Sequence, residues 1–287
     1  MRSAPVRLRT MQLDYFKMQG TGNQILVVDN RAENCAPPSV DALRRLGNSA
    51  TGPGFDSLMW ITPARRDDAL ASYRVFNCDG SEVEQCGNGI RCVAQALASD
   101  LKAGQDSMLL DSPAGPVTAR LVAPGQVAVN MGTPEFRPER VPFVAEKQQS
   151  AYDLDVAGEH YEVRVVSMGN PHCVLDVADV TGAEVARLGP LIECHERFPA
   201  RTNVGFMHIV NSGSIDLRVF ERGVGETAAC GTGSCAAMVV ARQRGLIDEE
   251  VTVHLPGGQV VVSWRHAADS VWLTGNAELI SQGTIDL

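Results

Sequence analysis

An internal repeat constrains this chain more than any other feature. Residues 73–89 (YRVFNCDGSEVEQCGNG) align with residues 217–233 (LRVFERGVGETAACGTG), which places Cys86 exactly 144 positions before Cys230. Two further pairs of segments recur in the same order at nearly the same spacing: 112–135 with 255–278, and 22–29 with 169–176. Such a repeat in register indicates duplication of one folding unit. We expect two similar domains that face each other, residues 1–130 with 276–287 and residues 131–275.

Each copy carries the same order of expected elements. A strand follows each Gly-Asn pair, and a strand with alternating polar and apolar residues leads into a glycine-bearing turn. After each Cys-Gly-x-Gly comes an alanine-rich stretch that is apolar on most sides, which predicts a buried helix. A Pro-x-Gly turn and a β-hairpin end each copy. The predicted fold class is α/β (α+β), with two pseudo-symmetric domains, each a mixed β-sheet wrapped around a buried central helix.

Composition excludes several classes of function. The 287 residues carry a formal charge of −9 without any basic block, which argues against nucleic acid as a partner. The longest apolar runs are too short to span a membrane, so no membrane partner is expected. Residues 1–10 lack the apolar core of a secretory signal and are interpreted as a short tail or an expression remnant. We therefore expect a cytoplasmic protein whose eight cysteines are reduced. None of them forms a C-x-x-C pair, and no metal site is predicted.

The two repeated cysteines each stand at the expected start of a helix. The first N–H groups of a helix have no intrahelical partner, and together with the helix dipole they favour an anion. This position predicts a lowered thiol pKa, and the glycines that follow leave the N–H groups open to a ligand carboxylate. Two such units around one carboxylate suit inversion of the adjacent carbon. One thiolate removes a proton, the opposite thiol donates one, and the N–H groups stabilise the developing charge. This chemistry requires no cofactor.

The residues alone leave other interpretations open. Cys86 and Cys230 could be core residues that form a structural disulfide. A cysteine hydrolase could use His172 as its base, although the repeat would give such an enzyme no need for a second cysteine. An amino-acid binding protein could use the helix-end anion sites, although it would not need both thiols. The repeat therefore favours a pair of catalytic cysteines.

Two segments resemble a known family. Residues 77–91 (NCDGSEVEQCGNGIR) fit the diaminopimelate epimerase signature, N-x-D-G-S-x4-C-G-N-G/A-x-R, at every fixed position, and residues 221–233 resemble the second active-site segment of that family. The resemblance extends from about residue 15 to the end of the chain. It implies a homodimeric isomerase, independent of pyridoxal phosphate, that interconverts LL- and meso-2,6-diaminopimelate on the route to lysine and peptidoglycan. It also implies that Cys86 and Cys230 are the two bases.

The resemblance further implies a set of residues that bind the distal amino-acid end of the substrate. Asn77, Asn170 and Asn203 match family asparagines at this end. Arg222 matches the arginine that takes the distal carboxylate, and Glu221 matches the acid beside it.

A second set is implied near the reacting carbon. Helix-end residues whose backbone N–H groups bind the reactive carboxylate match Gly87, Asn88, Gly231 and Thr232. Asn23 matches an asparagine near the substrate, and His172 matches a histidine close to the catalytic centre.

Ser57 is the main departure from the family pattern. The family commonly has glutamine at this position near the reactive cysteine, and serine is too short to make the same contact. This difference leaves open a racemase for a single amino acid. Such a substrate would leave Arg222 without a distal carboxylate, and an unpaired buried charge is costly, which favours diaminopimelate.

Overall fold

The computed structural model describes residues 12–83 and 86–286, so the tail expected at residues 1–10 lies outside the described residues. The first half of the molecule begins with the elements β1 (Gln12–Gly20), β2 (Asn23–Asp29), α1 (Val40–Gly47), β3 (Ser57–Thr62), β4 (Ala71–Asn77) and β5 (Glu82–Val83). It continues with α2 (Gly87–Ala96), the 3-10 helix η1 (Ala98–Asp100), β6 (Ser107–Ser112), β7 (Gly115–Ala123) and β8 (Gln126–Asn130).

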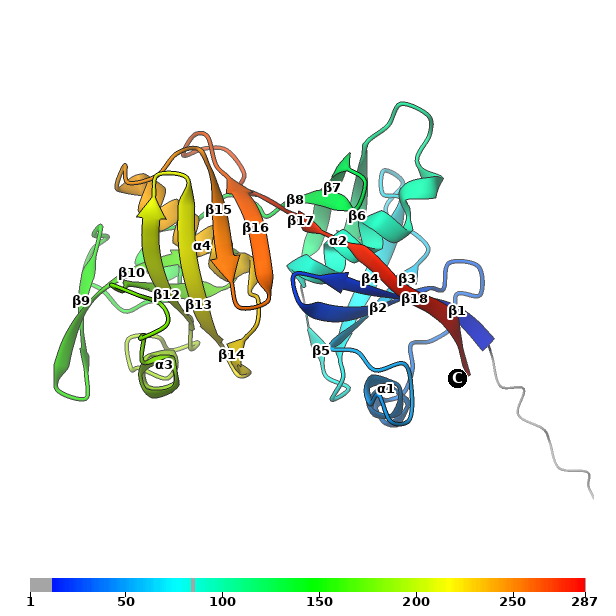
Figure 1. Cartoon of the computed structure of the whole chain (residues 1–287), viewed down its shortest axis with the longest axis horizontal. Helices are drawn as coiled ribbons and strands as arrows, with labels where there is room; N and C mark the ends of the chain where they lie inside the picture. Colours follow the sequence, from blue (N-terminus) through cyan, green and yellow to red (C-terminus); the bar gives the residue numbers. More distant parts are fainter. Residues whose placement is uncertain (1–11, 84–85, 287) are drawn as a thin grey trace, which may run out of the picture.

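The second half begins with the 3-10 helix η2 (Pro138–Arg140), β9 (Tyr152–Val156), β10 (Glu159–Ser167), β11 (Pro171–Asp176), α3 (Val185–Glu193) and β12 (Asn203–Asn211). It continues with β13 (Ser214–Glu221), β14 (Gly225–Thr227), α4 (Gly231–Gln243), β15 (Glu250–Leu255), β16 (Gly258–Ser263) and β17 (Trp272–Asn276). The last strand, β18 (Glu278–Asp286), returns to the first half and pairs with β1 (Figure 1).

Strand pairing in the second half reproduces that of the first. The pairs β2–β3 and β11–β12 are parallel, as are β4–β6 and β13–β15. Antiparallel pairs join β6, β7 and β8 in the same way as β15, β16 and β17. The registers agree as well, because Ile25 lies opposite Ser57 just as His172 lies opposite Asn203. The duplication read from the sequence is thus present at the level of single residues.

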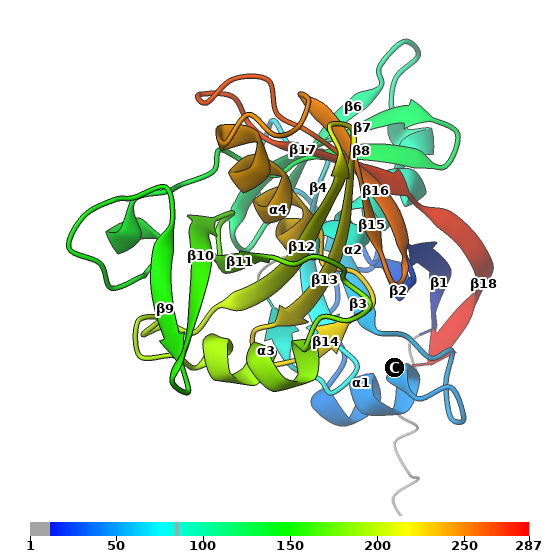
Figure 2. The same cartoon turned by 60° about the vertical axis from the view of Figure 1, so that its left-hand side comes forward.

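One helix in each half is enclosed by strands, which confirms the predicted fold class. Helix α2 contacts β1, β2, β3, β7 and β8, and α4 contacts β10 to β13, β15 and β16 (Figure 2). Small residues allow this close approach. A Cβ atom on Gly89 of α2 would collide with the Met59 side chain of β3, so any larger residue there would force Met59 to move. The alanines of α4 serve the same purpose, since every residue from Gly233 to Ala241 is buried.

The two halves are joined by backbone pairing and by a contact between turns. Strand β8 pairs antiparallel with β17, so the sheets of the two halves are continuous. The β1–β2 turn meets the β15–β16 turn so closely that a Cβ atom on Gly22 would lie 2.9 Å from Gly257 Cα. Gly22 also has φ +82, which favours glycine independently of the contact. The chain crosses back along β17 and β18, as the red segment in Figure 1 shows.

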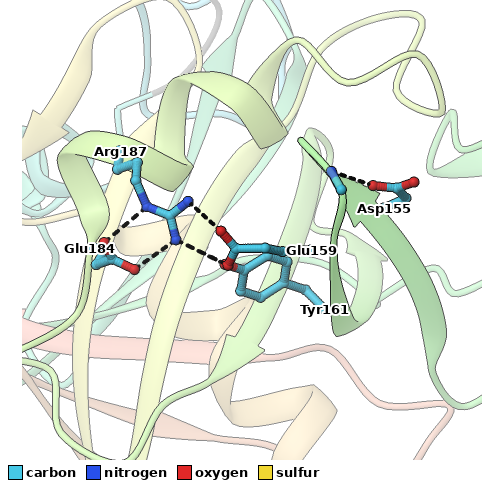
Figure 3. Close-up of polar contacts among 6 residues, drawn as sticks. Asp155, Glu159, Tyr161, Glu184 and Arg187 are labelled. Atoms are coloured by element: carbon cyan, nitrogen blue, oxygen red, sulfur yellow. Dashed lines mark hydrogen bonds and ion pairs between the residues drawn. The ribbon is translucent and has the colours of Figure 1, made fainter.

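Helices α1 and α3 lie at equivalent places in the two halves, each between two parallel strands, and neither was among the expected elements. In α3, Val185, Leu188 and Ile192 are buried, which gives the helix one apolar face. Arg187 fastens this helix to the β9–β10 hairpin. Its guanidinium bonds Glu184 of the preceding turn at 2.7 Å and the Tyr161 hydroxyl of β10 at 3.0 Å, and the same guanidinium pairs with Glu159 (Figure 3).

Candidate active site

Each repeated cysteine is the residue immediately before a buried helix. Cys86 caps α2 and Cys230 caps α4, both with extended backbone conformation. The Cys86 Sγ atom accepts a hydrogen bond from the Gly89 backbone N–H at 3.3 Å, so it occupies the place of a capping oxygen. Cys230 is buried, and Cys86 is half-buried. These positions confirm the prediction that both thiols stand at helix starts.

The two helix starts face each other. A Cβ atom on Gly231 would lie 4.0 Å from Gly87 Cα and 2.9 Å from Leu273 Cδ2. A Cβ atom on Gly87 would point to the same leucine, at 3.6 Å. The glycines therefore allow the two helices to meet across Leu273. This is a packing reason for their presence, and their role in admitting a carboxylate stays a prediction.

An asparagine contacts the first turn of each helix: Asn23 begins β2, and Asn170 lies in the turn just before β11. In the first half, Asn88 Nδ2 donates to Asn23 Oδ1 at 2.7 Å. At the equivalent place in the second half, Asn170 Nδ2 donates to Thr232 Oγ1 at 3.4 Å. Thr232 Oγ1 in turn lies 3.6 Å from Cys230 Sγ. Four residues predicted for the site therefore form two contacts, Asn23 with Asn88 and Asn170 with Thr232, at equivalent places in the two halves.

His172 orients Asn170 and is held neutral. Its Nε2 atom lies 3.0 Å from Asn170 Oδ1, and because a carbonyl oxygen only accepts, Nε2 carries the proton. Burial, assisted by the charge of Arg222, lowers the pKa of His172 to about 3. A ring whose pKa is held this low is a weak proton acceptor. The hydrolase interpretation, with His172 as a direct base, is therefore not supported.

Asn203 connects this region to Arg222. Its Nδ2 donates to the Pro171 carbonyl at 2.9 Å, and its Oδ1 accepts from the Arg222 backbone N–H at 3.0 Å. The Arg222 guanidinium donates to the Ala200 carbonyl at 3.1 Å and is otherwise exposed. The expectation of a buried charge at Arg222 is therefore wrong, because the residue lies in the exposed turn between β13 and β14. The cost of an unpaired buried charge therefore does not distinguish diaminopimelate from a single amino acid as the substrate.

Glu221 acts on both thiols. Its carboxylate accepts a hydrogen bond from the Thr227 hydroxyl at 2.5 Å, and its negative charge raises the pKa of both Cys86 and Cys230. A single carboxylate thus lies within electrostatic reach of both helix starts.

The thiol pKa values differ from the prediction. Burial is the largest effect at both cysteines and raises the pKa of each, well above the ordinary value for Cys230. The Gly89 N–H and the Arg91 charge lower the pKa of Cys86, but not enough to reverse the effect of burial. The prediction of lowered pKa values is therefore wrong, because withdrawal from water outweighs the helix end.

Ser57 and Asn77 lie next to each other at the ends of β3 and β4, in the antiparallel register. Ser57 is buried near Cys86, and its hydroxyl slightly lowers the pKa of that thiol. Asn77 is tied into its own turn, because its Nδ2 donates to Ser81 Oγ at 3.1 Å. The structure therefore places Ser57 near Cys86 and leaves Asn77 one strand away.

Three polar residues of this region are missing from the predicted set. Thr227 binds Glu221, and the buried Glu193 accepts from the Gly223 N–H at 2.7 Å, which holds the turn that carries Arg222. Neither has a signal in the sequence. Arg91 is the third, and it had a signal, because the family signature ends on this arginine.

Comparison with known proteins first defines the class of fold. The crystal structure of a hydroxyproline epimerase from Agrobacterium vitis superposes with a TM-score of 0.68 at 16% identity, covering 98% of this chain and 94% of that one. The chain thus has the fold of this epimerase, and in this chain a cysteine precedes each of the two central helices. Within the described residues, no helix is long and apolar enough to cross a membrane.

The sequence then assigns the family. The family model for diaminopimelate epimerase matches residues 15–137 and 164–280. The diaminopimelate epimerase of Thioalkalivibrio sulfidiphilus is 46% identical over 281 residues, and that of Alkalilimnicola ehrlichii is 44% identical over 279 residues. Each alignment covers 96% of this chain and 100% of the relative. The chain belongs to the diaminopimelate epimerase family.

Proposed function

We propose that this protein is an isomerase that interconverts LL- and meso-2,6-diaminopimelate, in lysine and peptidoglycan biosynthesis, with Cys86 and Cys230 as its two bases. The observation that carries the proposal is the meeting of two equivalent helix starts, each with a cysteine as the residue immediately before the helix. The name of the relatives at 44–46% identity supports the choice of substrate.

The chemistry needs one thiolate and one thiol. The thiolate takes the proton from the α-carbon on one face and becomes a thiol, while the opposite thiol donates its proton to the other face and becomes a thiolate. After the reaction the pair of cysteines carries the same total charge as before, but the thiolate is now on the other cysteine. A thiol whose pKa is raised by burial is a stronger base once ionised, which suits removal of a weakly acidic carbon-bound proton. The free N–H groups of α2 and α4 stabilise the charge that develops on the carboxylate.

The proposed roles of the other residues follow from their positions. Backbone N–H groups of Gly87, Asn88, Gly231 and Thr232 bind the reacting carboxylate, with Asn23 and Ser57 beside the first thiol. Asn77, Asn170, Asn203, Glu221 and Arg222 bind the distal amino-acid end, and His172 orients Asn170. The exposure of Arg222 supports this role, because its guanidinium can bind a carboxylate that arrives from solvent.

Solvent deuterium incorporation at the substrate α-carbon tests the proposal. With LL-diaminopimelate, the wild-type protein incorporates deuterium and forms the meso isomer, whereas Cys86→Ala and Cys230→Ala each lose at least about a thousandfold in epimerisation, as expected for loss of one acid–base group. The exposed Cys194 gives a matched control, and Cys194→Ala retains full turnover. A single-cysteine variant with near-normal turnover would refute the two-base mechanism. Absence of exchange in the wild type would indicate a binding protein, and exchange only with single amino acids would indicate a racemase.

We also propose the division into domains, residues 1–130 with 276–287 and residues 131–275. Two observations support it: β18 pairs with β1, and separate apolar clusters surround α2 and α4. Among the described strands β18 pairs only with β1, and it exposes Leu279 and Ile280, which supports a homodimer formed by a second copy of this edge. Light scattering after gel filtration, with Ile280→Lys as the variant, tests the dimer. Eight unpaired cysteines support a cytoplasmic location.

A further inference from the structure

Arg91 is a buried cation directly behind the start of α2. Its side chain is completely buried, and its Nη2 atom donates to Asn88 Oδ1 and to Thr21 Oγ1, each at 2.8 Å. Its Nε atom donates to the Asn276 carbonyl at 3.2 Å, where β17 leads into β18. The Nη1 group has no hydrogen-bond partner among the described residues. A guanidinium buried among neutral acceptors costs stability, and such a residue is retained where its charge has a use.

The backbone around Arg91 is shaped to hold it. A Cβ atom on Gly275 of β17 would lie 3.0 Å from Arg91 Cζ, and a Cβ atom on Gly20 of β1 would lie 3.5 Å from its Nη2. The side chain therefore lies against the backbone of two strands, and at Gly275 a larger residue would crowd the guanidinium. Arg91 is thus held by contacts with both ends of the chain, and through Asn88 it also holds Asn23.

The second half has no equivalent charge. The residue 144 positions after Arg91 is Cys235, which is buried in α4 and is a neutral thiol. Glu221, the charged residue whose effect reaches Cys230, is an anion, and it acts on Cys86 too. The two otherwise equivalent helix starts therefore differ by one positive charge.

We propose that Arg91 is a positioning residue that holds the Asn88 carboxamide at the start of α2 and stabilises negative charge on Cys86 in preference to Cys230. Cys86 is then the thiol that ionises first, and Cys230 holds the proton in the resting pair. The inference rests on the proposed function, in which both thiols exchange protons with substrate. It adds that one cysteine ionises before the other, which the symmetry of the repeat alone does not predict.

Other ionisable groups in the described part of the chain also act on Cys86. Cys86 is influenced by Arg91 and Cys92 of α2, by Glu221 at the end of β13 and by Tyr73 of β4. Burial raises the pKa of Cys92 to about 12 and that of Tyr73 further, so both stay neutral near pH 8. Glu221 raises the pKa of both thiols and has the larger part in the effect at Cys230, so it too favours ionisation of Cys86 over Cys230. Among the described residues, Arg91 is the positive charge that lowers the pKa of Cys86.

Alkylation by the neutral reagent iodoacetamide, followed for each cysteine by mass spectrometry of the full chain between pH 6 and 10, tests the proposal. Because only the thiolate reacts, Cys86 reacts at lower pH than Cys230 in the wild type. In Arg91→Met the rate at Cys86 falls about tenfold at pH 8, the effect of one pKa unit, while the rate at Cys230 changes less than about twofold. In Arg91→Lys the charge remains and the rate at Cys86 stays within about threefold, but kcat/KM falls because lysine cannot bond Asn88 and Thr21 together.

Arg164 of β10 provides the matched control. It is also buried and also has a nitrogen atom without a partner, yet it bonds Asp176 and Glu162 rather than a helix start. Arg164→Met leaves the ratio of the two alkylation rates unchanged. An unchanged ratio in Arg91→Met, or an equal fall at both cysteines, would overturn the proposal. If Arg91→Met does not fold, Arg91→Lys tests the proposal instead. This variant keeps the positive charge, so a tenfold fall in the ratio of the Cys86 rate to the Cys230 rate would contradict a role for the charge. Alkylation needs no turnover, so failure here is distinct from failure of the proposed function.

Discussion

Replacing Gly231 by alanine places a methyl group 2.9 Å from Leu273 Cδ2 and 4.0 Å from Gly87 Cα. Leu273 is completely buried between the two halves, so its side chain has no free space into which it can move. Adding a methyl group to such a packed region costs about 1–3 kcal/mol. The matched variant is Gly87→Ala, whose methyl group lies at ordinary contact distances of 3.6 Å from Leu273 and 3.7 Å from Met131.

The comparison of these two variants isolates the packing cost. Both glycines occupy the first position of a helix, so alanine reduces the entropy of the unfolded chain by a similar amount, about 0.5–1 kcal/mol, in each variant. That gain cancels in the difference, and Gly231→Ala should be less stable than Gly87→Ala by about 1–3 kcal/mol.

Urea unfolding followed by circular dichroism measures this difference, provided that the two variants have the same m value. Thermal unfolding gives a second measure, with a difference in Tm of about 2–4 °C per kcal/mol expected for a chain of this size class. Equal stability of the two variants, or lower stability of Gly87→Ala, would refute the interpretation that the helix starts meet across Leu273.

Three further outcomes are expected. Glu221→Gln removes the negative charge that raises the pKa of Cys86 and Cys230, so both thiols should react faster with iodoacetamide while kcat/KM falls. Thr227→Val keeps the charge of Glu221 and should leave the alkylation rates nearly unchanged. His172 has a folded pKa of about 3 against an ordinary 6.5, so the unfolded chain binds the extra proton between these values. Stability should therefore fall as the pH falls from 6.5 to 3, and His172→Gln should lose less, by up to a few kcal/mol in acid unfolding curves. Mild oxidation should link Cys86 to Cys230 and abolish turnover until dithiothreitol is added, and activity that is indifferent to this treatment would contradict the closeness of the pair.

Local patterns made much of this fold predictable. The position of Cys86 and Cys230 before their helices follows from glycine, alanine and cysteine spacing within some fifteen residues, and the repeat doubled the evidence. Pairing of Asn88 with Asn23 and of Thr232 with Asn170 also follows from the repeat, because equivalent residues occupy equivalent places.

Properties that depend on distant residues were not predictable. The raised thiol pKa values reflect burial by both halves of the molecule, which no segment of the sequence records. The exposure of Arg222 depends on how its turn is held, through Glu193, which lies thirty residues away in the sequence. The bond from Arg91 to Asn276 joins residues 185 positions apart.

The pairing of β1 with β18 has a consequence for biosynthesis. The two strands lie side by side from Gln12 opposite Asp286 to Gln19 opposite Glu278, although almost the whole chain separates them. During translation the first half is made early, but the β1 edge stays open until the last strand has left the ribosome. The second half carries β9 beside β10, its own counterpart of this pair, and completes its sheet from a short hairpin. We therefore expect the half that is synthesised later to finish folding first, and the long-range closure by β18 to be the slow step of folding.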